Sequence, residues 1–339
     1  MYKIKMLNLL RVRLKSFMQS LWGKIVSFFV SIWFKIKARL VFVAKRFWKR
    51  DYIPLYIAGI LFAIIASVSG IVVAHDTNKN IDSYRKMQQI FFDAKYDLKK
   101  IRNGEMDVPR IFIPNLPSDF NMIESQKEKK EMFIKFLLPL LLLKNEEIMA
   151  QRKRVIAIGD KIKKGGKPTA SEQTFLNDVR TEYKTDSNNI DDILIKLDEM
   201  SVSMAIGQAI QETGWGESRF LIKGNALFAE WTWGGEGMLP RARKSGLIHR
   251  IKTFPTLYHS VESYAKNLNR TKYYAGFRQM RSKLRAEGKS LDGAYLMSSM
   301  LRYSTEGNKY ILDVKKIIQA NRLNDFDKVK LAPIVDGRK

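Results

Sequence analysis

The stretch Ala205-Ile-Gly-Gln-Ala-Ile-Gln-Glu-Thr-Gly-Trp-Gly-Glu-Ser-Arg219 carries one carboxylate to the end of a predicted buried helix. Ala205, Ala209 and Glu212 are spaced at i, i+4 and i+7, so they share a helix face that is otherwise small and apolar. The glycines on either side of Trp215 permit backbone angles that other residues avoid. A carboxyl group beside an indole at a helix end predicts a raised pKa and a general acid at Glu212. The alternative is a partly exposed glutamate at a helix end.

The composition is strongly basic, with 60 Lys and Arg residues against 34 Asp and Glu residues and a net charge of +26. Residues 1–51 hold thirteen of the basic residues and the single acid Asp51. This balance favours anionic partners such as a phospholipid surface or an acidic polymer. The absence of cysteine excludes disulfides and thiolate metal sites, and the three scattered histidines are too few for a typical zinc site. We therefore expect neither a metal nor a cofactor.

Residues 53–74 form an uncharged run of 22 residues. Such a run is long enough to cross a hydrocarbon core of ~30 Å. Lysines and arginines crowd its N-terminal side, so the positive-inside rule places residues 1–52 in the cytoplasm. Residues 1–50 alternate basic and bulky apolar residues, and we expect them to lie on anionic lipid rather than to bind nucleic acid. A cleaved signal peptide is the alternative for the run, but the long basic lead favours a retained anchor.

The rest of the chain divides into three predicted parts. Residues 75–107 are predicted to form a helical stalk, because apolar residues there recur on one face. Residues 108–327 are predicted to form the main domain, which the proline-rich stretch Pro109–Pro117 enters in extended form. Residues 328–339 are predicted to be a flexible tail.

The pattern within the main domain is mostly helical. Apolar periodicity predicts a long helix over residues 125–163, with a core-helix centre rather than a second membrane span. Thr169 and either Ser201 or Ser203 are predicted to cap later helices. Alternating residues around a glycine cluster predict a small hairpin within residues 225–254. The expected fold class is therefore mainly α with a small β-hairpin lobe, preceded by a single transmembrane helix.

Four blocks of sequence follow one another in a recognisable order. They are Leu138-Pro-Leu-Leu-Leu-Leu-Lys-Asn-Glu-Glu147, the run from Gln208 to Ser218 with Gly224-Asn-Ala-Leu-Phe228, Trp231-Thr-Trp-Gly-Gly-Glu-Gly237, and Tyr303-Ser-Thr-Glu-Gly-Asn-Lys-Tyr310. Together they resemble the glucosaminidase domains of glycoside hydrolase family 73, and among these the Bax-type proteins. The resemblance covers residues 108–327 and implies a lysozyme-like helical fold.

The resemblance also implies a reaction, cleavage of the β-1,4 bond that follows N-acetylglucosamine in peptidoglycan, with Glu212 as the family's acid. Such hydrolysis needs a protonated carboxyl at the leaving oxygen and usually a second carboxylate. In related enzymes the second carboxylate comes from the β-lobe, where Glu236 is our first choice and Glu230 the second. The alternative for both residues is a solvated glutamate on the surface without a catalytic role. Glu217 is expected to be an exposed charge at the start of the next helix. Attack by the sugar's own acetamido group would need neither lobe carboxylate.

Candidate substrate-binding residues lie in and around the predicted lobe. Trp231 and Trp233 alternate along one strand and share a face, so they are either sugar platforms or the core of the lobe. Asn225 and Ser304 are weaker candidates, with turn or cap roles as the alternative.

Four tyrosines divide between the site and the core. Tyr274 and Tyr303 best match the tyrosines that the family places near the acid, so we expect them to position substrate or to polarise the attacking water. Tyr264 and Tyr310 sit at helical spacing, which is typical of core residues.

The combined prediction is a bacterial inner-membrane protein with its N-terminus in the cytoplasm and a peptidoglycan-cleaving domain in the periplasm. Two alternatives stay open. A lytic transglycosylase would use Glu212 alone and leave an anhydro end, whereas a non-catalytic tether would only bind the cell wall.

Overall fold

The computed structural model describes residues 81–234, 237–240 and 249–334. The chain divides into a unit Met1–His75 and a unit Asp76–Lys339, and all described residues belong to the second. The predicted cytoplasmic segment and membrane span lie outside the described residues. Within the described part of the chain, no helix combines the length and apolar character needed to cross a bilayer.

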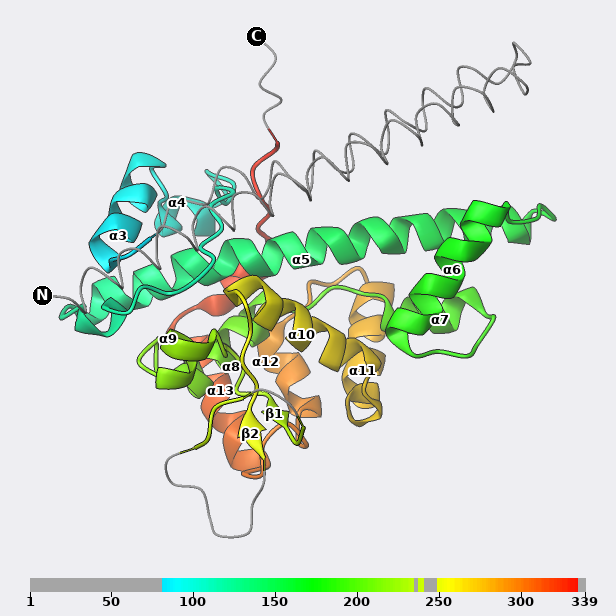
Figure 1. The fold of residues 1–339 in the computed structure, drawn as a ribbon. Helices are drawn as coiled ribbons and strands as arrows, with labels where there is room; N and C mark the ends of the chain where they lie inside the picture. The colour runs from blue at the N-terminus through cyan, green and yellow to red at the C-terminus, as the bar shows by residue number, and fades with distance from the viewer. Residues whose placement is uncertain (1–80, 235–236, 241–248, 335–339) are drawn as a thin grey trace, which may run out of the picture. The chain divides into compact units, whose positions relative to one another are not determined.

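One long helix organises the domain. Helix α5 (Gln126–Lys163) crosses the domain in Figure 1, and most of the helices that follow it in the chain lie on one side of it. Ser125 caps α5 by accepting a hydrogen bond from the backbone N–H of Glu128, so the predicted start and end of this helix are confirmed. The leucine-rich centre of α5 is buried, which confirms the prediction of a core helix.

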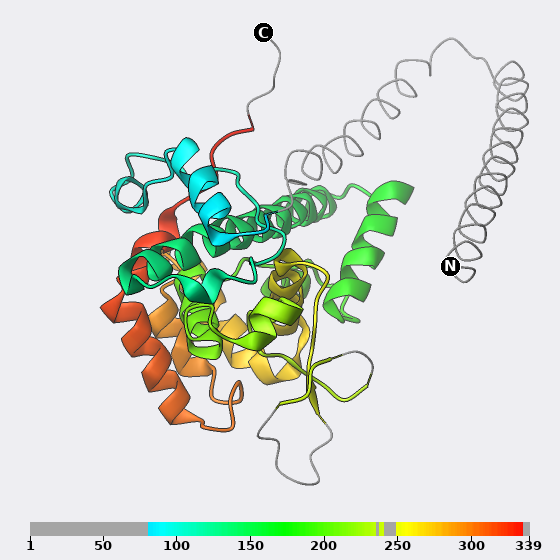
Figure 2. The same cartoon turned by 60° about the vertical axis from the view of Figure 1, so that its left-hand side comes forward.

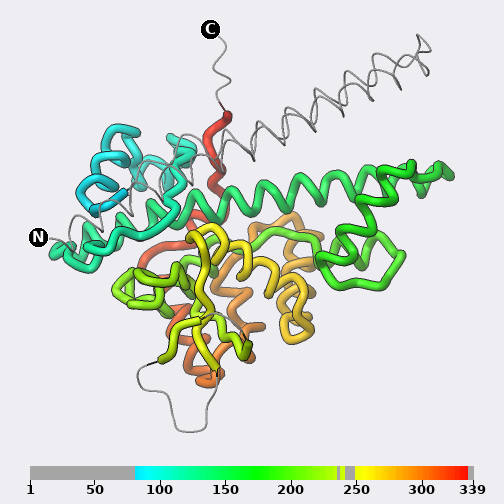
Figure 3. Tube along the Cα trace, viewed as in Figure 1, coloured from blue at the N-terminus to red at the C-terminus, as the bar shows by residue number. Residues whose placement is uncertain are grey.

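The helices after α5 lead the chain to the candidate acid. They are α6 (Ala170–Tyr183), α7 (Ile190–Lys196) and α8 (Val202–Thr213). Thr169 and Ser201 cap α6 and α8 respectively, as the sequence predicts. Figure 3 shows α6 and α7 beside the C-terminal end of α5. The next helix, α8, is buried along nearly its whole length.

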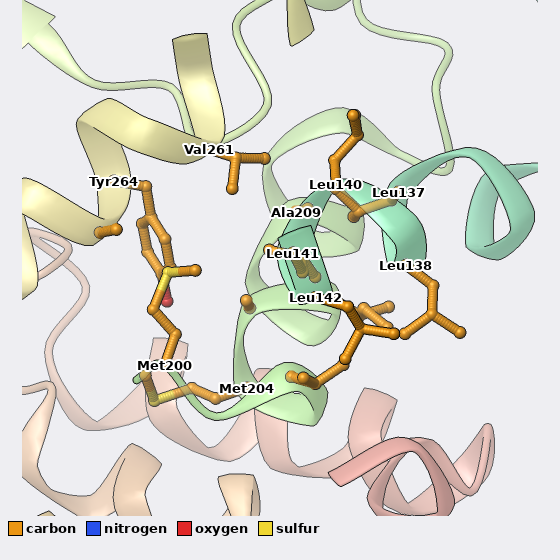
Figure 4. Packing of buried hydrophobic residues seen from close by; sticks show 14 of the residues in the cluster. Leu137, Leu138, Leu140, Leu141, Leu142, Met200, Met204, Ala209, Val261 and Tyr264 are labelled. Carbon is orange, nitrogen blue, oxygen red and sulfur yellow. The ribbon is translucent and has the colours of Figure 1, made fainter. Parts of the chain in front are cut away.

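Helix α8 is buried because neighbours cover it on several sides. Figure 4 shows the leucines of α5 facing residues of α8 and of α10 (Leu257–Arg270). The other helices that follow α8 in the chain are α9 (Arg219–Gly224), α11 (Ala275–Ala286), α12 (Gly293–Leu296) and α13 (Asn308–Ala320). The 3₁₀ turns of the domain include η2 (Phe120–Met122), η3 (Lys272–Tyr274), η4 (Met297–Ser299) and η5 (Leu323–Lys328). The mainly α fold class is therefore confirmed.

The predicted hairpin is present but shorter than the sequence pattern indicates. Strands β1 (Trp231–Thr232) and β2 (Arg250–Ile251) pair antiparallel, with Trp231 opposite Ile251. Asn225 and Ala229 adopt positive φ angles of 52° and 47°, which an extended strand does not allow, so pairing begins only after them. Figures 1 and 2 both show this β-lobe away from α5.

The described part of the predicted stalk is not free. Helices α3 (Tyr84–Asp93) and α4 (Leu98–Arg102) bury Met87, Phe91 and Ile101 in the same hydrophobic core as the main domain. The apolar face that predicts a helix here is thus covered by the domain. A solvated stalk would leave that face in water, at a free-energy cost.

The beginning of the predicted tail is also ordered. The backbone N–H of Val108 donates to the Lys330 carbonyl at 2.9 Å, and the Ala332 N–H donates to the Val108 carbonyl at 2.8 Å. Leu331 between them is buried. The boundary predicted at residue 328 is therefore wrong for the described residues up to 334, because main-chain pairing holds this segment against the start of the domain.

We predict that Gly293→Ala destabilises the domain by about 2 kcal/mol, since overpacking in a close contact costs that order of free energy. A Cβ at Gly293 would overlap the Ser203 hydroxyl and the backbone nitrogen of Met204, where α12 meets the start of α8. Gly276→Ala in α11 is the matched control, because nothing lies within 4 Å of its Cβ position. Urea unfolding measures both, and equal effects of the two substitutions would contradict this packing.

Candidate active site

Glu212 lies in the last turn of α8, before a sharp change in backbone direction. Gly214 ends the helix in the left-handed conformation, and Trp215 and Gly216 also have positive φ angles of 59° and 94°. A Cβ at Gly216 would come within 2.5 Å of the Phe120 ring. Both this close contact and the positive φ angle therefore require glycine at this position. The predicted glycine-broken turn is therefore confirmed.

The surroundings of Glu212 favour its neutral form. Burial raises the pKa of Glu212 to about 7, against an ordinary value of 4.5. The Tyr310 hydroxyl donates a hydrogen bond to Glu212 Oε1 at 2.9 Å, which lowers the pKa, and the charge of Glu306 raises it. A carboxyl group with such a pKa can hold a proton at neutral pH and release it to a substrate.

The indole beside Glu212 acts differently from the prediction. The Trp215 ring packs edge-on against Phe133 of α5 at 5.7 Å, and the Lys130 ammonium lies 5.1 Å from its centre. Trp215 thus anchors the turn to α5. The raised pKa of Glu212 follows from overall burial.

Tyr310 is the contact that sequence reasoning misses. It is buried, as a core residue should be, yet its hydroxyl reaches Glu212 from α13. Gln208 Nε2 donates to the Tyr310 hydroxyl at 3.2 Å, and the Tyr264 hydroxyl donates to Gln208 Oε1 at 2.7 Å. Helical spacing alone cannot separate this role from packing, because the ring is buried in either case.

The two predicted site tyrosines lie next to this group without a hydrogen bond to the acid. The Tyr303 ring stacks on Tyr310 with 5.5 Å between ring centroids, and its hydroxyl donates to the Phe228 carbonyl at 3.0 Å. Tyr274 is buried, with 6.3 Å between its ring centroid and that of Tyr303, and burial raises the pKa of Tyr274 to about 12. Tyr303 therefore supports the Tyr310 ring, and Tyr274 supports Tyr303.

Glu230, the second choice for the partner carboxylate, is held at the base of the β-lobe. The Ser263 hydroxyl donates to its Oε2 at 3.0 Å, and its Oε1 is buried with no hydrogen-bond partner among the described residues. Burial raises the pKa of Glu230, and nearby Lys252 and Ser263 oppose that rise. Glu236, the first choice, lies outside the described residues and stays a prediction.

Glu306 is a second carboxylate that the sequence analysis did not single out. It lies exposed in the loop before α13, with Lys309 Nζ 3.4 Å from its Oε2. Its charge adds to the rise in the pKa of Glu212 that burial causes. The available signal was its place four residues before Tyr310 in the last of the four sequence blocks.

The lobe tryptophans are open to solvent. Trp231 is 47% exposed and Trp233 is 67% exposed, so they do not form the core of the lobe. The Trp231 ring stacks on the buried His249 with 4.0 Å between ring centroids, and Trp233 lies 6.0 Å from Trp231. One rigidly backed indole and a more exposed one suit contact with the apolar faces of sugar rings.

The weaker candidates have structural partners. The Asn225 amide donates to the carbonyl oxygens of Phe254 and Pro255 at 3.0 and 3.3 Å, and Asn225 adopts the left-handed conformation that ends α9. Ser304 accepts a hydrogen bond from the backbone N–H of Glu306 at 3.2 Å. Both therefore support turns, which is the alternative that the sequence left open.

Glu217 is more than an exposed charge. Its carboxylate accepts a hydrogen bond from the buried Lys129 Nζ at 2.7 Å. This ion pair ties the chain after the Gly-Trp-Gly turn to the first turns of α5.

A cavity of about 250 Å³ lies at the other end of α8 from Glu212. Met200, Ser201 and Asp327 are among the residues that line it. The chemistry of Glu212 therefore does not belong to this cavity. Among the described residues, no group of three or more His, Cys, Asp or Glu side chains could hold a metal ion.

Comparison with known proteins finds similarity over this region. Residues 189–323 match the family model Glucosaminidase, described as mannosyl-glycoprotein endo-beta-N-acetylglucosaminidase. The chain is 27% identical over 199 residues to protein bax of Escherichia coli strain K12. The aligned region covers 57% of this chain and 69% of that protein. No solved structure matches the chain significantly. The matched region contains Glu212, Tyr303 and Tyr310.

The raised pKa of Glu212 links stability to pH in a defined direction. Between the ordinary pKa of 4.5 and the folded value of about 7, the folded state binds more protons than the unfolded state. Stability from this group is therefore fully present below about pH 4.5 and is lost as the pH rises through about 7.

We predict that Glu212→Gln is more stable than wild type at pH 8, by about 2 kcal/mol, because glutamine keeps the shape and removes a charge that is partly desolvated. The difference should shrink toward pH 4. Urea unfolding at both pH values measures it. Glu287→Gln is the control, since Lys289 lowers the pKa of that exposed carboxyl and no gain at pH 8 is expected. A difference that does not change with pH would contradict the raised pKa.

Proposed function

We propose, for a chain that carries a Bax-type glucosaminidase domain, that it is a peptidoglycan hydrolase with Glu212 as its general acid. The bond cleaved is the β-1,4 bond that follows N-acetylglucosamine. The observation that carries the proposal is the Glu212 carboxyl itself, half-buried at the end of α8 with a pKa of about 7 and a hydrogen bond from Tyr310. It lies within the region that matches the glucosaminidase family.

The proposed first step is proton transfer from Glu212 to the leaving glycosidic oxygen. A carboxyl with an ordinary pKa would be ionised at neutral pH and could not donate, whereas one near 7 is protonated in a large fraction of molecules. After the transfer, Tyr310 donates its hydrogen bond to the carboxylate that forms. The site thus holds the proton before the step and stabilises the charge after it.

The second carboxylate has two candidates. Glu236 is favoured by its place in the β-lobe, and Glu306 is favoured by its electrostatic effect on Glu212. Glu230 is a poorer choice, because Ser263 binds one of its oxygens and the other is buried. A separation from Glu212 of about 5–5.5 Å would favour retention of configuration, and one of about 6.5–9.5 Å would favour inversion.

The exposed tryptophans of the β-lobe are proposed to bind the sugar chain. Indole faces pack against the C–H faces of pyranose rings, and their polar edge leaves the hydroxyls free for other contacts. His249 supports the Trp231 ring from one side, which leaves its other face for the substrate. The wall polymer also carries carboxylates, which suit a chain with a net charge of +26.

The proposal extends to the place where the reaction occurs. The uncharged run over residues 53–74 would anchor the chain in a bacterial inner membrane, with residues 1–50 on the anionic cytoplasmic surface. The catalytic domain would then lie in the periplasm, where peptidoglycan is found.

We predict that Glu212→Gln lowers kcat/KM on purified peptidoglycan by about 10²- to 10⁴-fold, the range expected when a general acid is lost. Glu287→Gln, on the exposed end of α11, should cleave like wild type. Release of soluble fragments measures both. Mass spectrometry of the wild-type products should find a reducing N-acetylglucosamine end. An anhydro-muramyl end would replace the proposal by a transglycosylase, and equal cleavage by Glu212→Gln would leave only a wall-binding role.

We predict that Trp233→Ala raises KM for glycan chains about fivefold with little change in kcat, because one stacking contact contributes on the order of 1 kcal/mol. Phe92→Ala is the control, since Phe92 is a more exposed aromatic residue on α3. Steady-state kinetics on soluble glycan fragments separates KM from kcat. If Trp233→Ala and Phe92→Ala behave alike, the indole is no substrate platform.

A further inference from the structure

Glu212 is the end of a buried hydrogen-bond chain that begins on another helix. The Tyr264 hydroxyl donates to Gln208 Oε1 at 2.7 Å, Gln208 Nε2 donates to the Tyr310 hydroxyl at 3.2 Å, and that hydroxyl donates to Glu212 Oε1 at 2.9 Å. Tyr264, Gln208 and Tyr310 are all buried. Only the Tyr310 hydroxyl contacts Glu212. The hydrogen bonds of Tyr264 and Gln208 therefore act on the acid only through Tyr310.

The direction of this chain depends on the amide of Gln208. A hydroxyl can donate or accept, but an amide has one end that only donates and one that only accepts. The shorter 2.7 Å contact fits an O–H···O bond, and the longer 3.2 Å contact fits an N–H···O bond. The reverse amide orientation would leave the Tyr264 proton without an acceptor in a fully buried position, which is costly.

We propose that Gln208 is a positioning residue that fixes the direction of this chain, so that Tyr310 donates to Glu212 Oε1 and the acidic proton rests on Oε2. The inference rests on the proposed function and deepens it. Among the described residues no group hydrogen-bonds Oε2, and that oxygen is not enclosed, so it is the one available to a substrate.

The consequence for the reaction follows from counting protons. Because the Gln208 N–H donates to the Tyr310 oxygen, the Tyr310 proton cannot point toward Gln208 and points to Oε1 in both protonation states of Glu212. Oε1 therefore always accepts. The O–H bond that breaks during proton transfer is the one on Oε2, and its electron pair stays on the carboxylate that Tyr310 already binds. Without Gln208, Tyr310 could accept instead, and the proton could rest on Oε1, away from the substrate.

Other groups that face Glu212 are left in place by a change at Gln208. Glu306 raises the pKa of Glu212 by its charge, and the Tyr303 ring lies against Tyr310. Neither forms a hydrogen bond with Gln208. A change in the titration of Glu212 after substitution of Gln208 therefore reports on the hydrogen-bond chain.

The test uses Gln208→Met in the full-length chain, which keeps the side-chain volume and removes both polar ends. We expect kcat on peptidoglycan to fall about threefold to tenfold with KM unchanged, which is the effect expected from one buried hydrogen bond. We also expect the alkaline limb of the pH profile to move up by about 0.5 to 1 pH unit, because Tyr310 becomes a weaker donor to the Glu212 carboxylate. Loss of packing alone would lower stability without moving that limb.

A second test variant and a matched control accompany Gln208→Met. Tyr264→Phe keeps Gln208 and the ring stacked on Phe228, but it frees the amide to reverse, so it should shift the limb in the same direction. Ser260→Ala is the matched control, since it removes another buried hydrogen bond, from the Leu227 N–H, on the same helix α10. Its pH limb should coincide with that of wild type. If Gln208→Met does not fold, Tyr264→Phe decides the question.

A carbon-13 NMR titration of the Glu212 carboxyl in the same variants needs no substrate. It therefore tests the positioning role of Gln208 separately from the proposed hydrolase function. Glu212→Gln identifies the signal by its absence. A higher pKa in Gln208→Met and Tyr264→Phe, but not in Ser260→Ala, supports the role of Gln208 even if the wild-type chain cleaves no peptidoglycan. Titration curves that coincide with wild type in both chain variants overturn it, and so does an equal shift in Ser260→Ala.

Discussion

The hydrogen bond from the Tyr310 hydroxyl to the half-buried carboxyl of Glu212 is the interaction on which the candidate site depends. It requires α8 and α13 to approach closely, and Gly207 makes this possible. A Cβ there would lie 2.8 Å from the Ile318 side chain of α13. Helix α5 covers another side of α8 with its leucine-rich centre, so the helix that carries the carboxyl is buried while Glu212 itself is half-buried at its end. The raised pKa follows from this packing.

The same packing explains how the rest of the site is supported. Trp215 and the Lys129–Glu217 ion pair fasten the turn after Glu212 to α5, and the tyrosines around Tyr310 fill the space between α10 and α13. The acid therefore stands on rigid elements. By contrast, the tryptophans proposed to bind sugar lie on a short hairpin with two residues in each strand. Rigid placement of the acid suits proton transfer, and a small exposed lobe suits contact with a long polymer.

What the sequence could predict was local. Capping chemistry within four residues predicts that helices start after Thr169 and Ser201, and apolar periodicity predicts the long helix after Ser125. The position of Glu212 follows from helix phase and the glycine turn. The Tyr310 contact spans 98 residues along the chain, and no local pattern encodes which way a buried hydroxyl points. The predicted stalk fails for a related reason. An amphipathic helix shows that a partner exists, but not that the partner is the domain that follows it.

The most direct test of Glu212 as general acid is the dependence of its substitution on the leaving group. Kinetics of wild type and Glu212→Gln should be compared on peptidoglycan and on an N-acetylglucosamine oligosaccharide with a dinitrophenyl leaving group, which departs without protonation. If Glu212 is the acid, the substitution should cost about 10²- to 10⁴-fold on peptidoglycan and far less on the aryl glycoside. An equal loss on both substrates would show that Glu212 serves the reaction in another way and would contradict the account.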